Sequence, residues 1–299
     1  MGKGKMNQIK NIKQKIDRIE NDLNKRRKLK EDLVDFFAEM YVFAQQNNLD
    51  LEKIKREADK LMLTWWKNQG KIKGKDVSVK TAYKKWAKKY EENFNPLTFT
   101  INNKINGFVS NIKGKNVLDL GCGTGKHSFL AAKKGAKVTG FDFSKDMLKQ
   151  AKLKNKRLKN KIKFVHGNLT KKLPFKSSSF DIVLCSLVLD HIKNIQPIFK
   201  EINRVLKKNG RFIFADLHPR LAQNTKYPLF KKDKTEFYTE KYYHSISELF
   251  RISQKSIFLI KSILELKVPK KIPAKEKKLI QGTDFFIKPI AIIIEFIKK

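Results

Sequence analysis

Cysteine is nearly absent from this sequence, and its scarcity limits both covalent and metal chemistry. Only Cys122 and Cys185 occur among the 299 residues, and neither belongs to a C-x-x-C motif or a His/Cys cluster. A disulfide framework and a structural zinc site are therefore excluded, and no metal site is expected. Because unpaired cysteines are typical of a reducing compartment, we expect a cytoplasmic protein.

Long hydrophobic runs are also missing. The N-terminal residues MGKGKMNQIK are not followed by an apolar segment, so we expect no signal peptide. The most apolar stretch, FFIKPIAIIIEFIKK at 285–299, is short and is interrupted by Lys288, Pro289 and Glu295. A transmembrane segment is therefore not expected, and we interpret this stretch as a buried strand.

Acidic residues are few, and the charge is strongly positive. The chain has 67 lysines and arginines against 29 acidic residues, a formal net charge of +38, but only nine of the basic residues are arginines. Proteins that recognise nucleic acids use more arginine, because its planar group binds phosphate and guanine. Residues 1–75 carry 19 basic and 11 acidic residues, so the excess is not confined to this segment. We favour solvated lysine-rich surfaces, with RNA as an alternative partner.

The first 75 residues differ in pattern from the rest. Their apolar residues begin by recurring three and four positions apart, at Ile9, Ile12, Ile16, Ile19 and Leu23. This spacing is typical of one side of a helix, and a second helical pattern follows at 51–70. The sequence predicts a helical hairpin extension over 1–75, which would act in oligomerisation, as a lid or in partner binding. We interpret 71–80 as a linker.

Apolar segments and helical segments alternate from residue 76 onward. Such alternation is typical of a parallel sheet that is covered by helices on both faces. The sequence therefore predicts an α/β domain over 76–299, with a doubly wound, mostly parallel, seven-stranded Rossmann-like sheet. The expected strands are 116–120, 137–143, 161–168, 180–186, 210–217, 256–268 and 285–297. The expected helices include 81–94, 125–135, 145–157 and 195–208.

A glycine-rich turn follows the first of these strands. The segment NVLDLGCGTGKHS at 116–128 places three glycines within five positions. A P-loop and a dinucleotide-binding turn both have wider glycine spacing, so neither ATP nor a dinucleotide is expected. Asp142 follows Gly121 by 21 residues, at the end of the next strand. A carboxylate there can accept hydrogen bonds from both hydroxyls of a ribose, which predicts an adenosine-like cofactor without a pyrophosphate.

These motifs resemble those of class I S-adenosylmethionine-dependent methyltransferases. The glycine turn and VTGFDFSKDML at 138–148 are similar to motifs I and II of that family. The segments HGNLTKKLPFKSSSFDIVLCSLVLDHI (166–192) and EINRVLKKNGRFIFADLHP (201–219) agree in order and spacing. The pattern is similar to the broad type 11 group, which includes quinone and other small-molecule methyltransferases. The resemblance covers roughly 80–299 and implies S-adenosylmethionine as the cofactor.

The resemblance assigns cofactor-binding roles to residues at the ends of the first two strands. It implies that Asp119 lies under the turn and orients the methionine end of the cofactor. The backbone of Gly121 and Gly123 would meet the cofactor directly. Asp142 would hold the ribose, and Phe143 would flank the adenine.

Further residues receive roles from the same resemblance. Asn168, where the family more often has Asp, would meet the adenine amino group, because an amide oxygen can still accept that hydrogen bond. Leu169 would line the same pocket, and Ser186 would approach the methionine moiety. The segment AYKKWAKKYEENFNP at 82–96 is similar to the helix that closes over the cofactor, with Tyr83 and Tyr90 as its candidate aromatic residues. Ordinary packing of an amphipathic helix is the alternative for both tyrosines.

Methyl transfer requires alignment of the acceptor with the methyl group and, for some acceptors, a base that removes a proton. His191, His218 and His244 are the histidines considered for this base. His191 and His218 are the candidate catalytic residues, because both come at the carboxyl end of a predicted strand. The alternative for each is a structural loop or capping histidine. Asp190 and Asp216 are expected to orient their neighbours.

Methylation of a small molecule is the function that this pattern favours, and methylation of RNA, such as tRNA, is the alternative. The segment SLVLDHI at 186–192 lacks the Asn/Asp-Pro-Pro-aromatic stretch of enzymes of this fold that methylate exocyclic amines of nucleic acids. Its absence excludes that subclass but not methylation of uridine or ribose. A non-catalytic scaffold that binds the cofactor is a third hypothesis, which the complete glycine turn and Asp142 disfavour.

Overall fold

The computed structural model describes residues 73–91, 94–159, 161–219, 230–232, 235–272 and 287–299. The helical hairpin expected at 1–75 lies outside the described residues except for 73–75. The chain divides into two compact units, and the described residues belong almost entirely to the unit that comprises 74–232, 236–279 and 284–299. That unit contains the central sheet and the candidate site.

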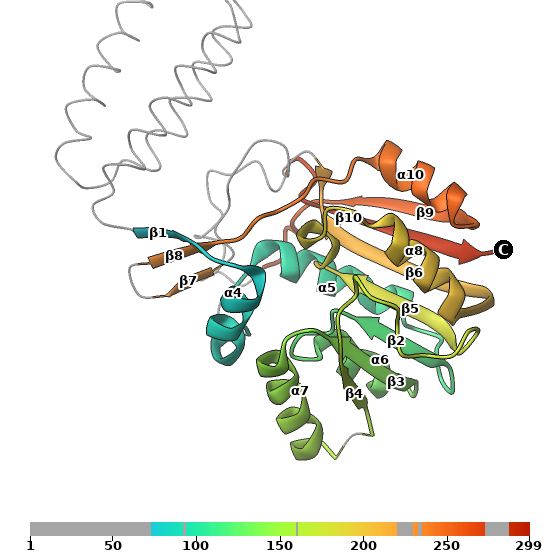
Figure 1. Cartoon of the computed structure of the whole chain (residues 1–299), viewed down its shortest axis with the longest axis horizontal. Coiled ribbons are helices and arrows are strands. Elements are labelled where there is room, and N and C mark those ends of the chain that lie inside the picture. The colour runs from blue at the N-terminus through green and yellow to red at the C-terminus, as the bar shows by residue number, and fades with distance from the viewer. Residues whose placement is uncertain (1–72, 92–93, 160, 220–229, 233–234, 273–286) are drawn as a thin grey trace, which may run out of the picture. The chain divides into compact units, whose positions relative to one another are not determined.

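A seven-stranded sheet forms the centre of this unit (Figure 1). Its strands are β2 (Asn116–Leu120), β3 (Lys137–Asp142), β4 (Lys163–His166), β5 (Phe180–Ser186), β6 (Leu206–Leu217), β9 (Phe258–Leu266) and β10 (Ala291–Lys298). They lie in the order β4-β3-β2-β5-β6-β10-β9. The first five are parallel, whereas β10 runs antiparallel to both of its neighbours. The predicted mostly parallel, seven-stranded sheet is confirmed.

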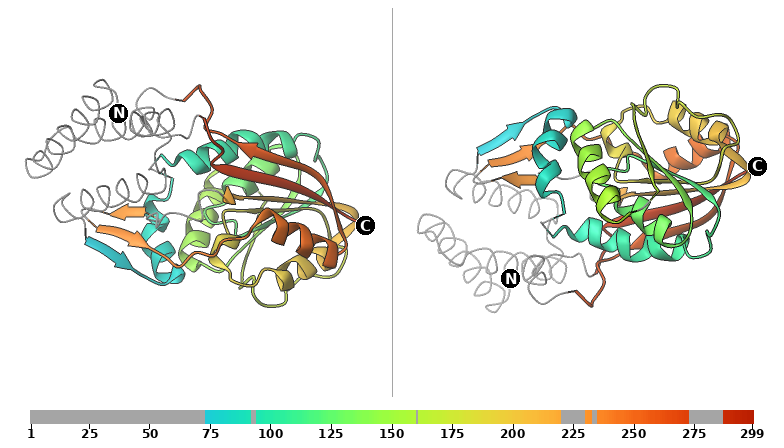
Figure 2. Two further views of the ribbon diagram at one scale, coloured as in Figure 1. Left: turned by 90° about the horizontal axis from the view of Figure 1, so that it is seen from above. Right: turned by 90° about the horizontal axis from the view of Figure 1, so that it is seen from below.

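Helices cover both faces of the sheet, as expected for a doubly wound fold. They are α5 (Pro96–Phe108), α6 (Lys126–Lys133), α7 (Lys145–Arg157), α8 (Gln196–Val205) and α10 (Ile246–Lys255). Helices α8 and α10 lie on one face, and α5 and α6 lie on the other (Figure 2). Helix α7 packs against β3 and β4 and begins at its predicted cap, because the Ser144 hydroxyl accepts a hydrogen bond from the Met147 N–H.

The core beneath α8 is built from phenylalanine rings and branched aliphatic side chains. Phe199 of α8 meets Phe212 of β6 edge to face with ring centroids 5.3 Å apart, and Phe212 stacks on Phe296 of β10 at 5.3 Å. Ile292, Ile294 and Phe296 of β10 are buried because this strand lies between β6 and β9. The interpretation of the apolar C-terminal stretch as a buried strand is therefore confirmed for Ala291–Lys298, whereas residues 287–290 lie outside the strand and Ile287 is exposed. Among the described residues, no helix has the length and apolar character required to cross a bilayer.

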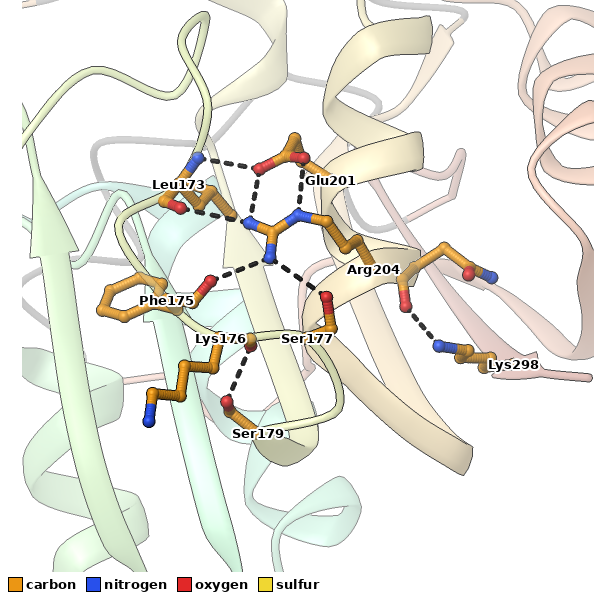
Figure 3. Close-up of polar contacts among 9 residues, drawn as sticks. Leu173, Phe175, Lys176, Ser177, Ser179, Glu201, Arg204 and Lys298 are labelled. Atoms are coloured by element: carbon orange, nitrogen blue, oxygen red, sulfur yellow. Dashed lines mark hydrogen bonds and ion pairs between the residues drawn. The ribbon is translucent and has the colours of Figure 1, made fainter.

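Arg204 of α8 fixes the loop that leads into β5 (Figure 3). Its guanidinium pairs with both carboxylate oxygens of Glu201 at 2.8 Å each. It also donates to the backbone oxygens of Leu173 at 3.1 Å and Phe175 at 2.8 Å. Only the planar, five-donor group of arginine can satisfy so many acceptors at once. The same loop begins with residues 168–170, which line the candidate site.

The interpretation of 71–80 as a linker is wrong for its described part. Strand β1 (Lys73–Asp76) is followed by helix α4 (Val79–Trp86) and the 3-10 turn η1 (Ala87–Lys89). Helix α4 starts two residues before the predicted helix, because the Ser78 hydroxyl accepts the Thr81 N–H at 3.3 Å and so caps it. Strand β1 belongs to a second sheet of order β1-β8-β7, with β7 (Phe230–Lys232) and β8 (Thr235–Tyr238). This sheet was not predicted from the sequence.

The second sheet packs against α4 through a stack of aromatic rings. Phe237 of β8 stacks on Phe230 of β7 with centroids 4.7 Å apart, and Phe230 stacks on Trp86 of α4 at 5.4 Å. Ala82 on the same helix is fully buried in this cluster. A helix of only eight residues has little stability of its own, so this packing fixes where α4 lies.

Candidate functional site

A cavity of about 210 Å³ lies at the carboxyl ends of β2, β3 and β5. The strand order reverses between β2 and β5, and ligands of open α/β sheets bind at such a switch point. Nine of the ten predicted cofactor-binding residues line the cavity: Tyr83, Tyr90, Gly121, Gly123, Asp142, Phe143, Asn168, Leu169 and Ser186. The structure therefore brings together residues that are distributed over more than 100 positions of the sequence.

The glycine turn closes the cavity from the side of β2. Gly121, Gly123 and Gly125 all have positive φ angles, of 69°, 54° and 85°. A Cβ atom on Gly121 would collide with the side chain of Val188, whereas one on Gly123 would meet no atom within 4 Å. Gly121 is thus required by close packing, and Gly123 leaves open space beside the cavity. This bare backbone allows a ligand to approach the turn closely.

Asp142 ends β3 at the cavity and also holds the turn in place. One carboxylate oxygen accepts the Gly123 N–H at 2.8 Å, and the other accepts the Ser144 N–H at 2.7 Å. Burial raises the pKa of Asp142 above its ordinary value, and these two backbone hydrogen bonds oppose that shift. Each oxygen can accept a further hydrogen bond, so the carboxylate can still bind ribose hydroxyls.

Asp119 is the one predicted cofactor residue that does not line the cavity. It lies beneath the glycine turn with 2% of its surface exposed, and its carboxylate accepts a 2.6 Å hydrogen bond from the Ser128 hydroxyl. Burial raises the pKa of Asp119 to about 7, and the Ser128 hydrogen bond opposes this shift. In this position Asp119 ties the end of β2 to α6 and does not line the cavity.

His191 and Tyr83 form a pair on the wall of the cavity. The Tyr83 hydroxyl oxygen and His191 Nε2 are 3.0 Å apart, and their rings meet edge to face at 5.6 Å. Burial lowers the pKa of His191, which keeps it neutral at neutral pH, although Asp190 opposes this shift. Burial raises the pKa of Tyr83 well above 10, so its hydroxyl stays protonated and can donate to Nε2. A neutral imidazole at this place can accept a proton.

The hydroxyl of Ser186 is the clearest test of whether the cavity suits a polar ligand. Its side-chain oxygen is buried and has no hydrogen-bond partner among the described residues, yet the residue lines the cavity. Buried hydroxyl groups are almost always hydrogen-bonded, so this oxygen is expected to meet a polar group of a bound molecule. Together with the bare backbone at Gly123, it shows that the cavity fits a polar ligand such as the predicted cofactor.

His218 and His244, the other two histidines considered as the base, do not line this cavity. His218 Nε2 is 3.0 Å from a carboxylate oxygen of Glu265 on β9, and the backbone N–H of His218 donates to the Ile290 carbonyl oxygen. His244 Nε2 lies 3.2 Å from the Leu189 carbonyl and 2.9 Å from that of Ile192, so it fixes the turn that carries His191. Of the two candidate catalytic histidines, the structure therefore places only His191 at the cavity.

A smaller cavity of about 90 Å³ adjoins the site at the end of β6 and contains two buried carboxyl groups. Asp190 pairs with Lys241 at 3.0 Å. Burial alone would raise the pKa of Asp190, but His191 and Lys241 hold it below its ordinary value. Burial and the nearby Asp190 raise the pKa of Asp216 well above its ordinary value. The sequence offered no signal for Lys241, because it belongs to a segment without a regular pattern.

A family model for a methyltransferase domain matches residues 111–277, which is more than half of the chain. The chain belongs to this methyltransferase family. The prediction of a class I S-adenosylmethionine-dependent methyltransferase is confirmed, and with it S-adenosylmethionine as the cofactor. The hypothesis of a non-catalytic scaffold is accordingly set aside.

Curated relatives of this methyltransferase match over part of their length. A demethylmenaquinone methyltransferase of Lactococcus lactis is 41% identical over 119 residues, which cover 38% of this chain and 46% of the relative. An uncharacterized protein of Haemophilus influenzae is 37% identical over 115 residues, which cover 37% and 45%. The chain thus spans less than half the length of these relatives. The match therefore does not assign their methyl acceptors to this chain.

Solved structures share the fold of the methyltransferase at low sequence identity. A putative S-adenosylmethionine dependent methyltransferase from Listeria monocytogenes matches with a TM-score of 0.54 and 24% identity, over 69% of this chain and 100% of that chain. A chain from the complex between the Haloferax volcanii Trm112 methyltransferase activator and a putative methyltransferase matches with a TM-score of 0.56 and 18% identity, over 74% and 97%. At this identity the likeness concerns the fold alone.

Proposed function

We propose that this methyltransferase transfers the methyl group of S-adenosylmethionine to an uncharged small molecule. The observation that carries the proposal is the chemistry of the cavity wall. Although the chain has 67 lysines and arginines, none of them is among the residues that line this cavity in the described part of the chain. Apart from the residues with cofactor roles, the described wall is mostly aliphatic and consists of Val79, Thr170, Leu187, Val188, His191 and Ile192. Such a wall suits an apolar ring system better than a phosphate chain.

The names of the curated relatives support a small acceptor. The demethylmenaquinone methyltransferases of Lactococcus lactis and Tropheryma whipplei are 41% and 40% identical to this chain in the matched segments. A quinone-like acceptor has a flat, uncharged and largely apolar ring, which agrees with the cavity wall. It is the acceptor class that we would examine first.

We assign the cofactor to the side of the cavity formed by the glycine turn and β3. Asp142 would accept the ribose hydroxyls, and Phe143 and Leu169 would enclose the adenine. The Asn168 amide oxygen already accepts hydrogen bonds from the Thr170 N–H at 2.9 Å and the Thr170 hydroxyl at 3.0 Å, so it would accept the adenine amino group only if that hydroxyl turned away. Ser186 would supply its unpartnered hydroxyl to the methionine part. When bound, the cofactor supplies a methyl group on a positively charged sulfur, which leaves as a neutral thioether.

His191 is the residue to which we assign proton removal. As a methyl group becomes bonded to an acceptor oxygen or other nucleophilic atom, the proton on that atom must leave. Because the Tyr83 hydroxyl donates to the one basic nitrogen of the neutral His191 ring, the proton would pass to the Tyr83 oxygen while Tyr83 gives its own proton to His191 Nε2. Tyr83 fixes the orientation of the imidazole through the 3.0 Å contact with Nε2. The rings of Tyr83, Tyr90 and Phe143 keep water from the reacting atoms.

The proposal is tested by offering both acceptor classes to the full chain. Purified protein is incubated with S-adenosylmethionine labelled in its methyl group, either with a metabolite and quinone extract or with total RNA. We expect label in the small-molecule fraction, at a rate that falls by about 100-fold in His191→Asn. His244→Asn is a control for loss of structure near His191, since His244 fixes the same turn from outside the cavity. Label in RNA alone would overturn the proposal.

A further inference from the structure

Three side chains from separate elements meet beside the cofactor cavity at Glu91. Glu91 follows η1, Thr124 belongs to the glycine turn, and Lys154 lies on α7. The same carboxylate oxygen of Glu91 accepts hydrogen bonds from the Thr124 hydroxyl and from the Lys154 ammonium group, the latter at 2.5 Å. We call these three residues the Glu91 bridge. The cofactor roles implied by the sequence include none of them.

The bridge joins two walls of the cavity. Glu91 comes directly after Tyr90, and the segment from α4 to η1 contributes Val79, Tyr83 and Tyr90 to the cavity wall. Thr124 stands between Gly123 and Gly125, within the turn that forms the opposite wall. A hydrogen bond between Glu91 and Thr124 therefore holds the aromatic segment against the glycine turn.

The hydrogen bond to Thr124 is the stronger part of the bridge. Thr124 is only 3% exposed, so its hydroxyl needs an acceptor inside the protein. Burial alone would raise the pKa of Glu91, but the hydrogen bonds from Lys154 and Thr124 hold it below its ordinary value, so the acceptor is ionised. The side chains of Lys154 and Glu91 are 24% and 41% exposed, so solvent screens their ion pair.

We propose that Glu91 is a positioning residue for the cofactor: through Thr124 it holds the α4–η1 segment closed over the glycine turn. The bridge thereby slows the departure of bound cofactor, and it must open when the thioether product leaves. This inference rests on the S-adenosylmethionine site but not on the identity of the acceptor. Lys154 has a secondary effect that depends on ionic strength.

The test compares variants that break the bridge at different points. Thr124→Val removes the hydroxyl at nearly constant volume, and Thr124→Ser retains it. Glu91→Gln keeps an acceptor oxygen but removes the charge. Lys154→Met removes the ion pair, and Lys207→Met is its matched control, because Lys207 forms a partly exposed 3.0 Å ion pair with Asp181 at the amino end of β5.

Affinity for S-adenosylhomocysteine, measured by calorimetry, is the first readout. We expect Thr124→Val to bind about tenfold more weakly, Glu91→Gln to be intermediate, and Thr124→Ser to remain within about twofold of wild type. Lys154→Met should lose less than about threefold, and only at low salt, while Lys207→Met should match wild type. In turnover, Thr124→Val should raise KM for S-adenosylmethionine, because the cofactor binds more weakly. The value of kcat should not fall, because release of the thioether product becomes faster.

Hydrogen exchange of the ligand-free protein is the second readout. Amides of residues 79–91 should exchange faster in Thr124→Val and Glu91→Gln but not in Thr124→Ser, with melting temperatures showing that each variant is folded. The proposal would be overturned if Thr124→Val and Glu91→Gln both exchanged amides 79–91 at the wild-type rate and both bound S-adenosylhomocysteine within twofold of the wild type. If wild type does not bind S-adenosylhomocysteine, the cofactor assignment fails, whereas the exchange measurement still decides whether the bridge exists.

Discussion

At the residue scale, Asp142 shows how one carboxylate can serve both the ligand and the fold. The spacing of Asp142 from the glycine turn predicts contact with a ribose. The structure adds two backbone hydrogen bonds, from Gly123 and Ser144, that no sequence pattern reveals. Because both donors are N–H groups, they require an acceptor on each side of the carboxyl group. The residue therefore supports the shape of the turn before any ligand arrives.

Asp142→Asn is expected to weaken both cofactor binding and folding. The amide NH₂ of asparagine must face the N–H of either Gly123 or Ser144, so one hydrogen bond is replaced by two opposed donors. We expect the free energy of unfolding to fall by about 1–3 kcal/mol and affinity for S-adenosylhomocysteine to fall at least about tenfold. Urea unfolding and calorimetry measure these. Asp146→Asn, in the first turn of α7, is the control and should leave the affinity unchanged.

Asp119 gives a prediction about pH. Its pKa rises from an ordinary value of 3.8 to about 7 on folding, so between these values the native state holds a proton that the unfolded state has released. The free energy of unfolding contributed by this group therefore falls as pH rises toward 7 and is constant above it. Asp119→Asn removes the titration while its amide oxygen can still accept the Ser128 hydroxyl.

The measurement for Asp119 is urea unfolding of the wild type and Asp119→Asn between pH 5 and pH 8. Relative to wild type, the variant should gain about 1–3 kcal/mol of unfolding free energy over this interval. For each protein the change in unfolding free energy between the two pH values is compared, because this change cancels any pH-independent effect of the asparagine on stability. Parallel stability curves for the two proteins would contradict the assigned pKa.

At the scale of elements, the loop before β5 depends on one arginine rather than on regular structure. Arg204 and Glu201, one turn apart on α8, bind the backbone at Leu173 and Phe175 (Figure 3). The beginning of the same loop carries Asn168, which lines the cavity. Fixing the loop at one end thus helps to position a cofactor contact at the other.

Arg204→Lys should loosen this loop without altering the charge of the protein. A lysine can reach only part of the acceptors that the guanidinium satisfies, so we expect a loss of about 1–3 kcal/mol in unfolding free energy. Hydrogen exchange at residues 170–179 should rise more than exchange in β10. Arg251→Lys, at an exposed position of α10, is the matched control and should change neither quantity. Unchanged exchange in the loop of Arg204→Lys would show that other contacts hold it.

Elements defined by local pattern could be predicted from the sequence, and elements defined by distant pairing could not. Ser144 as a helix cap and the apolar run in β10 are local signals, and the structure confirms both. Strand β1 has no such signal, since its partner β8 lies more than 150 residues away. The histidines show the same limit. His191 and His218 both come after strands, but His218 directly follows β6, which pairs with the antiparallel β10. Its ring lies near Glu265, away from the switch point.

At the scale of the whole molecule, the cavity does not explain the net charge of +38, because no lysine or arginine is among its described lining residues. Residues 147–180 contain eleven lysines and arginines and no acidic residue. Lys149, Lys152 and Lys156 follow one another along an exposed side of α7. Such a surface attracts any polyanion, whether or not it is a substrate. Affinity for RNA is therefore expected even if the acceptor is a small molecule.

Binding and turnover should respond differently to salt if the charge is not part of the active site. RNA affinity should fall at least about tenfold between 50 and 200 mM salt, because phosphate contacts release counterions. At a given salt concentration, the double variant Lys152→Glu/Lys156→Glu on α7 should bind RNA more weakly than the wild type. The control is Lys193→Glu/Lys200→Glu, which makes the same charge change near and on α8 and should bind RNA more strongly than the α7 variant. Methyl transfer to a small acceptor should vary less than about twofold across these proteins and salt concentrations. Turnover that falls in parallel with RNA binding would show instead that the basic surface delivers the methyl acceptor.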